Sequence, residues 1–284
     1  MLSWPPGGFA YSANNLPSTP TTASRGTTVT ASGSTNTKGS VVQLLPAQTF
    51  DIELIEIAIS CSGVAGSDSA SLLDIVGDPS GGTSWVTSSQ GTLIQNLLAG
   101  WTNILGIAST FSGRRYIFPL KIPAGTSIGA RMQSAIASQT ADVSITVRGG
   151  HRSPYWSGNK VTTIGADLTN SRGTMVTPGS TGTYGSWTNI DGLTSRSFRA
   201  IIIKSQGTPG TGTAGARAYY LQAGIGSVQI GPTYCFNVTT SEVSSDVDPG
   251  SPIQFEVPEG IHLQARATSS NTAFDIDVAM YGIS

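Results

Sequence analysis

The sequence predicts an all-β protein: two tandem jelly-roll-like β-sandwich domains from an internal duplication, preceded by an extended N-terminal arm. Three observations predict this class. Short apolar runs alternate with turn clusters rich in glycine, proline and serine. No regular series of helical patterns separates these runs. One stretch of the chain also occurs a second time, about half a chain length later.

The first 24 residues differ from the rest and are predicted to form the arm. They carry several prolines and lack any periodicity, so they cannot build a core of their own. We expect Trp4, Phe9 and Tyr11 to anchor this arm on a neighbouring subunit. A disordered tail that happens to contain aromatic residues is the alternative.

The repeat defines the two sandwich domains. Residues 24–40 read SRGTTVTASGSTNTKGS, and residues 171–186 read SRGTMVTPGSTGTYGS; with one residue deleted, most positions are identical. The halves also end alike, because FPLKIPAG and QFEVPEG each lead into a strand-like run that contains an arginine. The sequence therefore predicts domains at 25–150 and 165–284, joined by a linker at 151–164. We expect the isolated segment 165–284 to fold by itself.

Nearly every recognisable element within the domains is a strand. Residues 51–59 and 261–267 alternate between apolar and polar side chains, as half-buried strands do. The stretch 93–101 is ambiguous, because Leu93, Ile94, Leu97, Leu98 and Trp101 also fit helical spacing. A single short helix there is the alternative.

Composition excludes several classes of function. Only 11% of the 284 residues are charged, against about 25% in an average protein, and the formal net charge is −1. No basic field for nucleic acid is present, and no apolar run is long enough to cross a membrane. The N-terminus does not resemble a secretory signal, so we expect the protein to be made and released in the cytoplasm. Cys61 and Cys235 are predicted to be buried, reduced thiols.

Titratable groups that could perform chemistry are sparse. The two histidines, His151 and His262, are predicted to lie in the linker and on a solvent-facing strand position. The GTSIG pattern at 125–129 lacks the strand-to-helix context of a nucleophile elbow. Asp275 and Asp277 alternate along the last strand, and a second acidic group lies at 242–248; both are predicted to be solvated. We therefore expect no catalytic residue, no metal and no cofactor, and a protein that is not an enzyme.

Two pairs of arginines occupy matching positions in the two halves: Arg25 with Arg172, and Arg131 with Arg266. Ordinary solvent-facing roles inherited from the duplicated ancestor are one interpretation. The other is that these side chains pair with carboxylates across a domain or subunit boundary.

Two stretches of the first half carry a resemblance to a known family. They are the segment IQNLL at 94–98 and the segment FPLKIPAGTSIGARMQS at 118–134. Together they resemble virion structural proteins of tailed bacteriophages. The resemblance implies a non-enzymatic component of the virion exterior or tail, present in many copies that bind one another and other virion proteins. A tail, baseplate or fibre-attachment protein and a head decoration protein are equally compatible with it.

A second class of function is a module that binds host-surface glycan. Sandwich domains can present exposed aromatic rings to sugars, and the candidates are Trp85, Trp101, Trp156 and Trp187. Trp101 lies in an apolar run and Trp156 in the linker, so these two are predicted to be structural.

Overall fold

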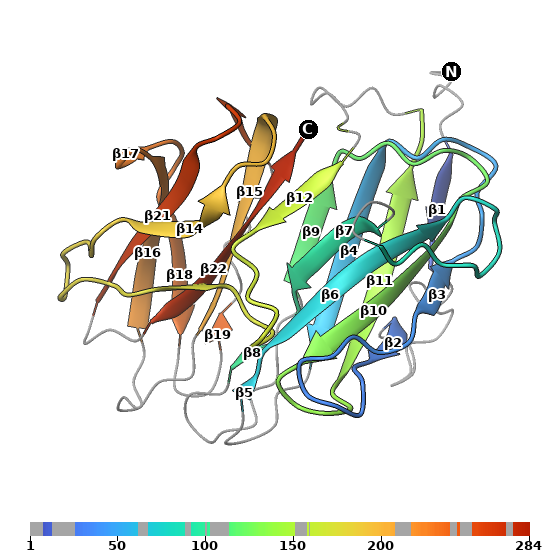
Figure 1. Ribbon diagram of the computed structural model, residues 1–284, viewed down its shortest axis with the longest axis horizontal. Helices are drawn as coiled ribbons and strands as arrows, with labels where there is room; N and C mark the ends of the chain where they lie inside the picture. Colours follow the sequence, from blue (N-terminus) through green and yellow to red (C-terminus); the bar gives the residue numbers. More distant parts are fainter. Residues whose placement is uncertain are drawn as a thin grey trace, which may run out of the picture.

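The fold is known from a computed structural model, in which every described element is a β-strand (Figure 1). The structure describes residues 8–12, 26–61, 68–88, 92–99, 101–102, 114–150, 158, 160–207, 217–238, 243–244, 252–270 and 275–284. Within these ranges no helix occurs that could cross a membrane. The prediction of an all-β sandwich protein is confirmed.

The first half forms two sheets. The β11 sheet has the order β1-β11-β4-β9, with β2 also paired to β11, and the β10 sheet has the order β3-β10-β6-β7. Their strands are β1 (Phe9–Tyr11), β2 (Thr27–Thr30), β3 (Val42–Leu45), β4 (Leu54–Cys61), β6 (Ser71–Asp78), β7 (Thr92–Leu98), β9 (Arg114–Phe118), β10 (Ser127–Ser134) and β11 (Thr140–Arg148). A separate short pair joins β5 (Asp68–Ser69) to β8 (Trp101–Thr102).

The second half repeats this arrangement. The β22 sheet has the order β12-β22-β15-β20, with β13 also paired to β22, and the β21 sheet has the order β14-β21-β16-β18-β19, with β17 beside β16. Their strands are β12 (Val161–Ile164), β13 (Thr174–Val176), β14 (Thr188–Leu193), β15 (Phe198–Gly207), β16 (Arg217–Ile225), β17 (Val228–Gln229), β18 (Tyr234–Val238), β19 (Val243–Ser244), β20 (Ile253–Val257), β21 (His262–Ser269) and β22 (Ile276–Ile283). The strands that the two halves have in common follow the same order, as a duplication requires, and the β21 sheet has β17 and β19 in addition.

Two short strands lie outside the domains that the sequence suggested. Phe9–Tyr11, which we assigned to the arm, is the edge strand β1 of the β11 sheet. Val161–Ile164, which we assigned to the linker, is β12 and pairs with Ile283 to Met280 of β22. The two strands are equivalent, since each shares one side of a long central strand with a second short strand. Strands of three or four residues are too short to reveal themselves by alternation.

The ambiguous stretch at 93–101 contains no helix in its described residues. Thr92–Leu98 forms β7, which pairs with β6 through two irregularities of register. At one of them Asn96 adopts a φ of 52°, in the left-handed region. These shifts place Leu97 and Leu98 in the core together, which is why their spacing imitated that of a helix.

The halves pack side by side and share one hydrophobic core (Figure 1). The central strands β15 and β22 of the β22 sheet are buried on both faces. One face, with Ile201 and Met280, packs on the β21 sheet, and the other, with Ile202 and Tyr281, packs on the first half. Separating the halves would expose the apolar face that packs on the first half, and the expectation that the segment 165–284 folds by itself stays a prediction.

The burial of both faces corrects the interpretation of Asp277. We expected Asp275 and Asp277 to lie on a solvated face, but Asp277 is fully buried and accepts a hydrogen bond from Gln206 at 3.4 Å. Lys204, also buried, lies with its Nζ 5.2 Å from the centre of the Tyr116 ring of the first half. The polar face of these strands therefore meets the other half of the chain instead of water.

Candidate functional site

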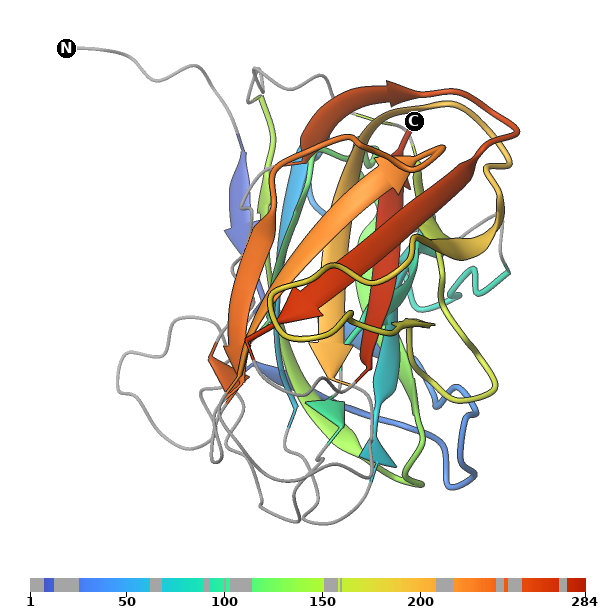
Figure 2. The ribbon, with the colours of Figure 1, turned by 90° about the vertical axis from the view of Figure 1, so that its left-hand side faces the viewer.

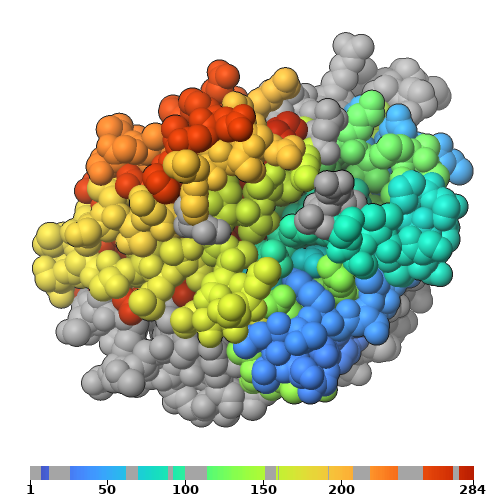
Figure 3. All heavy atoms as spheres, in the orientation of Figure 1, coloured from blue at the N-terminus to red at the C-terminus, as the bar shows by residue number. Residues whose placement is uncertain are grey.

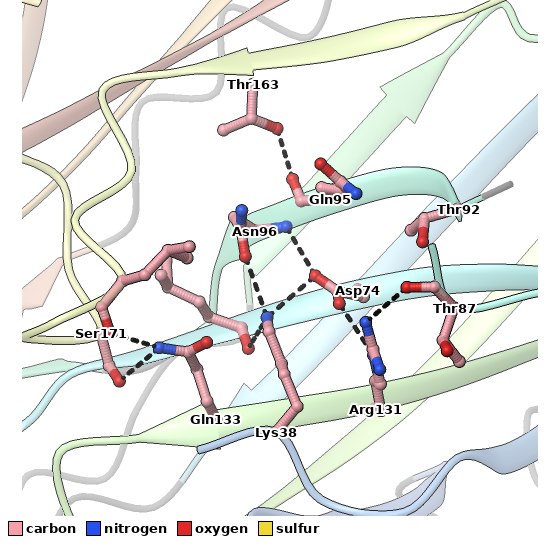
Figure 4. Close-up of polar contacts among 12 residues, drawn as sticks. Lys38, Asp74, Thr87, Thr92, Gln95, Asn96, Arg131, Gln133, Thr163 and Ser171 are labelled. Atoms are coloured by element: carbon pink, nitrogen blue, oxygen red, sulfur yellow. Dashed lines mark hydrogen bonds and ion pairs between the residues drawn. The ribbon is translucent and has the colours of Figure 1, made fainter. Parts of the chain in front are cut away.

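A buried polar cluster lies on the outer face of the β10 sheet, where the halves meet (Figure 4). Its centre is Asp74 on β6, whose carboxylate is almost fully buried. Lys38 Nζ lies 2.8 Å from one oxygen and Arg131 Nε 3.0 Å from the other. The backbone N–H of Asn96 donates a third hydrogen bond to this carboxylate at 2.9 Å. Four segments that are far apart in the sequence are thereby joined at one side chain.

The Lys38 amine is held as a structural cation. It donates to the Leu72 carbonyl, to Asp74 and to the Asn96 side chain, which are three acceptors for its three protons. Burial lowers the pKa of Lys38, and the neighbouring Asp74 opposes that shift. With every proton donated, the amine presents no lone pair for nucleophilic chemistry.

The same face ties the first half to the turn before β13. Gln133 of β10 donates to the Leu168 carbonyl and to Ser171 Oγ, and Ser171 in turn donates to Asn36. Thr163 of β12 donates to the Gln95 carbonyl of β7. In the space-filling view the segment around residue 170 lies directly against the segment around residue 36 (Figure 3). The cluster therefore fixes how the two halves sit together.

The equivalent position of the second half is arranged differently. Arg266 pairs with Gln222 across β21 and β16, as Arg131 pairs with Asp74 across β10 and β6. Its Nε donates to the Gln222 side chain at 2.8 Å. The guanidinium carbon lies 4.7 Å from the centre of the Tyr184 ring and 4.5 Å from that of Trp187. An amide thus takes the place of the carboxylate, and two aromatic rings flank the cation.

The segment between β13 and β14 brings both rings to this face. Its backbone bonds to β21, with Gly179 and Gly185 donating to the Ala267 carbonyl. Figure 2 shows this yellow segment crossing in front of β21. Trp187 lies over Gly224 of β16, where a Cβ would come within 2.5 Å of the indole ring. Glycine at 224 therefore makes the space that the tryptophan occupies.

Replacing Gly224 by alanine should displace Trp187. The added methyl overlaps the indole ring and lies 2.9 Å from the Val228 carbonyl, so the ring or the β16–β17 turn must move. We expect a red-shifted tryptophan emission and a loss of about 1–3 kcal/mol in the free energy of unfolding. Gly192→Ala is the control, because a Cβ there meets nothing within 4 Å. Equal spectra for the two variants would contradict the placement of Trp187.

A third feature is the edge strand β1. Phe9 and Tyr11 point outward from it, 56% and 41% exposed, with their ring centres 5.9 Å apart. Arg148 of β11 lies over the Phe9 ring. Ala10 points the other way and packs on the core. The result is an exposed aromatic pair on the open side of the β11 sheet.

The predicted arginines are found with local partners. Arg131 pairs with Asp74, Arg266 with Gln222, and Arg172 Nε lies 3.9 Å from Asp167, all within their own halves. Among the described residues, these three side chains therefore do not pair across the domain boundary, and a role at a subunit boundary stays a prediction. Arg25 and Trp4 lie outside the described residues.

The structure describes only some of the remaining residues that the sequence singled out. Trp85 is half-buried with its ring against Gly129, while Trp156 and the side chain of Trp101 lie outside what is described. His262 is exposed on β21, as expected, whereas His151 and the acidic group at 242–248 fall largely in undescribed segments. Cys61 is buried and Cys235 half-buried, and both are free thiols. Among the described residues no group of three or more metal-ligating side chains is found.

The residues missed from the sequence are Lys38, Asp74, Tyr184 and Gln222. Asp74 carried the clearest signal, since a carboxylate stands inside the apolar run SLLDIVGD. The repeat drew attention to Arg131 and Arg266 but not to their partners.

Comparisons with known proteins give only distant similarity. No protein-family model matches the sequence, and no curated protein matches it. Among solved structures, PNGF-II is 10% identical with a TM-score of 0.35, covering 92% of this chain and 65% of its own. PNGase F, a glycosylasparaginase from Flavobacterium meningosepticum, is 10% identical with a TM-score of 0.34, covering 98% and 96%. This chain therefore spans less than two thirds of the PNGF-II chain.

These neighbours correct one expectation from the sequence. We expected a protein that is not an enzyme, and that expectation is contradicted because PNGase F is a glycosylasparaginase. We withdraw it. At these TM-scores no activity carries over to this chain, and the resemblance to virion proteins stays a prediction.

Proposed function

We propose that the chain is a structural subunit of a tailed-phage particle, which assembles with copies of itself and with other virion proteins through the edge strand β1. The observation that carries the proposal is the exposed Phe9–Tyr11 pair on that edge. The resemblance at 94–98 and 118–134 and the low content of charged residues, 11%, support it.

An edge strand with outward aromatic rings is suited to contact another chain. β1 pairs with β11 on one side, and among the described residues no strand pairs with its other side. Unpaired backbone groups on such an edge can accept a strand from a second copy. Aromatic residues are also enriched at the centres of protein interfaces. We take a second copy of this chain as the partner of β1.

The aromatic pair is tested by replacing both rings while the strand is kept. The double variant Phe9→Thr, Tyr11→Thr retains β propensity and Ala10, so the fold should persist with a melting temperature within about 4 °C of the original. Light scattering should show that its oligomers dissociate. Val228→Thr, which removes an exposed apolar side chain far from β1, is the matched control. Oligomers that survive in the double variant to the same extent as in the control would refute the role of β1.

Glycan binding is the second candidate function. It is favoured by the outer face of the β21 sheet, where Tyr184 and Trp187 stand beside the amide side chain of Gln222. Aromatic rings with a few placed polar groups are typical of small-molecule sites. Quenching of tryptophan emission by oligosaccharide tests this candidate, and an unchanged spectrum across the titration would speak against it.

A further inference from the structure

One difference between equivalent positions of the two halves is a difference in charge: Asp74 of the first half corresponds to Gln222 of the second. In the first half the register of β10 and β6 places Arg131 opposite Asp74, and the two side chains form an ion pair. In the second half the same register places Gln222 opposite Arg266. Among the described residues Arg266 makes no ion pair, so its positive charge is not neutralised there.

The Arg266 side chain is nevertheless held in place. Its Nε is fixed by Gln222, and its guanidinium lies beside the rings of Tyr184 and Trp187. Gln222 is itself fixed, because its amide donates to Thr233 at 3.0 Å. The two terminal nitrogens of Arg266 make no hydrogen bond within the described part of the chain. A positioned arginine with free terminal nitrogens is suited to bind a planar oxyanion through two parallel hydrogen bonds.

Uncharged polar side chains continue the face beyond Arg266. Gln264 lies two residues before it on β21, and Asn189 of β14 stands directly opposite Gln264. The Gln264 amide donates to Asn189 at 2.9 Å, which leaves the amide protons of Asn189 without a partner among the described residues. Such groups both donate to and accept from hydroxyls. A ligand with one carboxylate and several hydroxyls therefore matches this row of one guanidinium and two amides better than a simple anion does.

We infer that Arg266, flanked by Tyr184 and Trp187 and followed by Gln264 and Asn189, forms a site for an acidic saccharide, in which Arg266 binds the sugar carboxylate and the amides bind hydroxyls. This inference rests on the second candidate function and names its ligand class. It is independent of assembly through β1. At the equivalent place in the first half, Arg131 already pairs with Asp74.

The probe is a pair of sugars with the same backbone, tetragalacturonate and its fully methyl-esterified form, in which each carboxylate becomes an uncharged methyl ester. Binding to the full-length protein is followed by calorimetry and by tryptophan emission, to which Trp187 contributes. We expect the acid to bind at least about tenfold more tightly than the ester, since hydrogen bonds to a charged group are the stronger ones. Raising the salt from about 0.01 M to about 1 M should weaken the acid form alone.

Three variants locate the site. Arg266→Gln removes the cation, and Gln222→Asp recreates the closed pair of the first half; each should weaken binding of the acid by about tenfold or more. Gln222→Asp keeps the arginine and the rings, so it tests the site even where Arg266→Gln does not fold. Arg115→Gln is the control, because Arg115 is exposed on the first half and pairs with Glu56. Its affinity should stay within about twofold of the original.

The outcomes separate this inference from the function on which it rests. An ester that binds as tightly as the acid, or unchanged affinity in both site variants, overturns the acidic-saccharide site while glycan binding stands. Failure of both sugars to bind the unaltered protein overturns the inference and the second candidate function together.

Discussion

Replacing Asp74 by asparagine is expected to lower the free energy of unfolding by about 3–5 kcal/mol. The carboxylate is 3% exposed and neutralises both Lys38 and Arg131, so its loss leaves two cations side by side in a poorly hydrated place. Asparagine keeps the shape, so the change reports charge and not packing. Urea denaturation monitored by circular dichroism measures it.

The control for this prediction is the exposed pair of Glu56 and Arg115. Their N–O distance, 2.7 Å, is as short as those at Asp74, but the arginine side chain is 53% exposed. Water replaces the lost partner there, so Glu56→Gln should cost no more than about 1 kcal/mol. Similar losses for the two variants would show that Asp74 is not a buried structural anion.

Replacing Tyr281 by alanine is expected to cost about 3–5 kcal/mol. This ring lies between the halves, edge-on to Tyr116 at 5.5 Å and to Phe118 at 6.0 Å, and it is fully buried. Its loss leaves a cavity at the centre of the shared core. Calorimetry should show one unfolding transition for the original protein and a lower melting temperature for the variant, with the transition broadened or divided as the halves uncouple.

Tyr281→Phe separates the ring from the hydroxyl. The hydroxyl accepts from the buried Leu98 N–H at 2.9 Å, so phenylalanine should cost about 1–3 kcal/mol for an unpaired donor. A loss below about 1 kcal/mol in the alanine variant would contradict the shared core.

The strands of this fold could be predicted where one face meets water. β4 alternates between buried and half-buried residues along its whole length, and the alternation is plain in its sequence. β22 also alternates, with Ile276, Asp277 and Val278, but its burial is complete on both faces. Polar residues on one face of a strand indicate that this face does not lie in an apolar core. They do not show whether the face contacts water or the other half of the same chain. That is why Asp277 was assigned to a solvated face.

The candidate site could be predicted only in part. Comparing the halves identified Arg131 and Arg266 because the repeat preserves them in one alignment. Their different partners, Asp74 and Gln222, follow from strand register, which is set by bulges and loop lengths that a single sequence does not reveal. Tyr184 and Trp187 reach Arg266 through the path of a loop, and loops have no periodicity to read.

The most direct test of assembly through β1 is the mass of the full-length protein in solution, measured by light scattering over a range of concentrations. The account predicts oligomers heavier than the 29.2 kDa chain, with a fraction that rises with concentration and closed symmetry in negative-stain images. A mass of 29.2 kDa at every concentration, unchanged by the Phe9→Thr, Tyr11→Thr double variant, would contradict it.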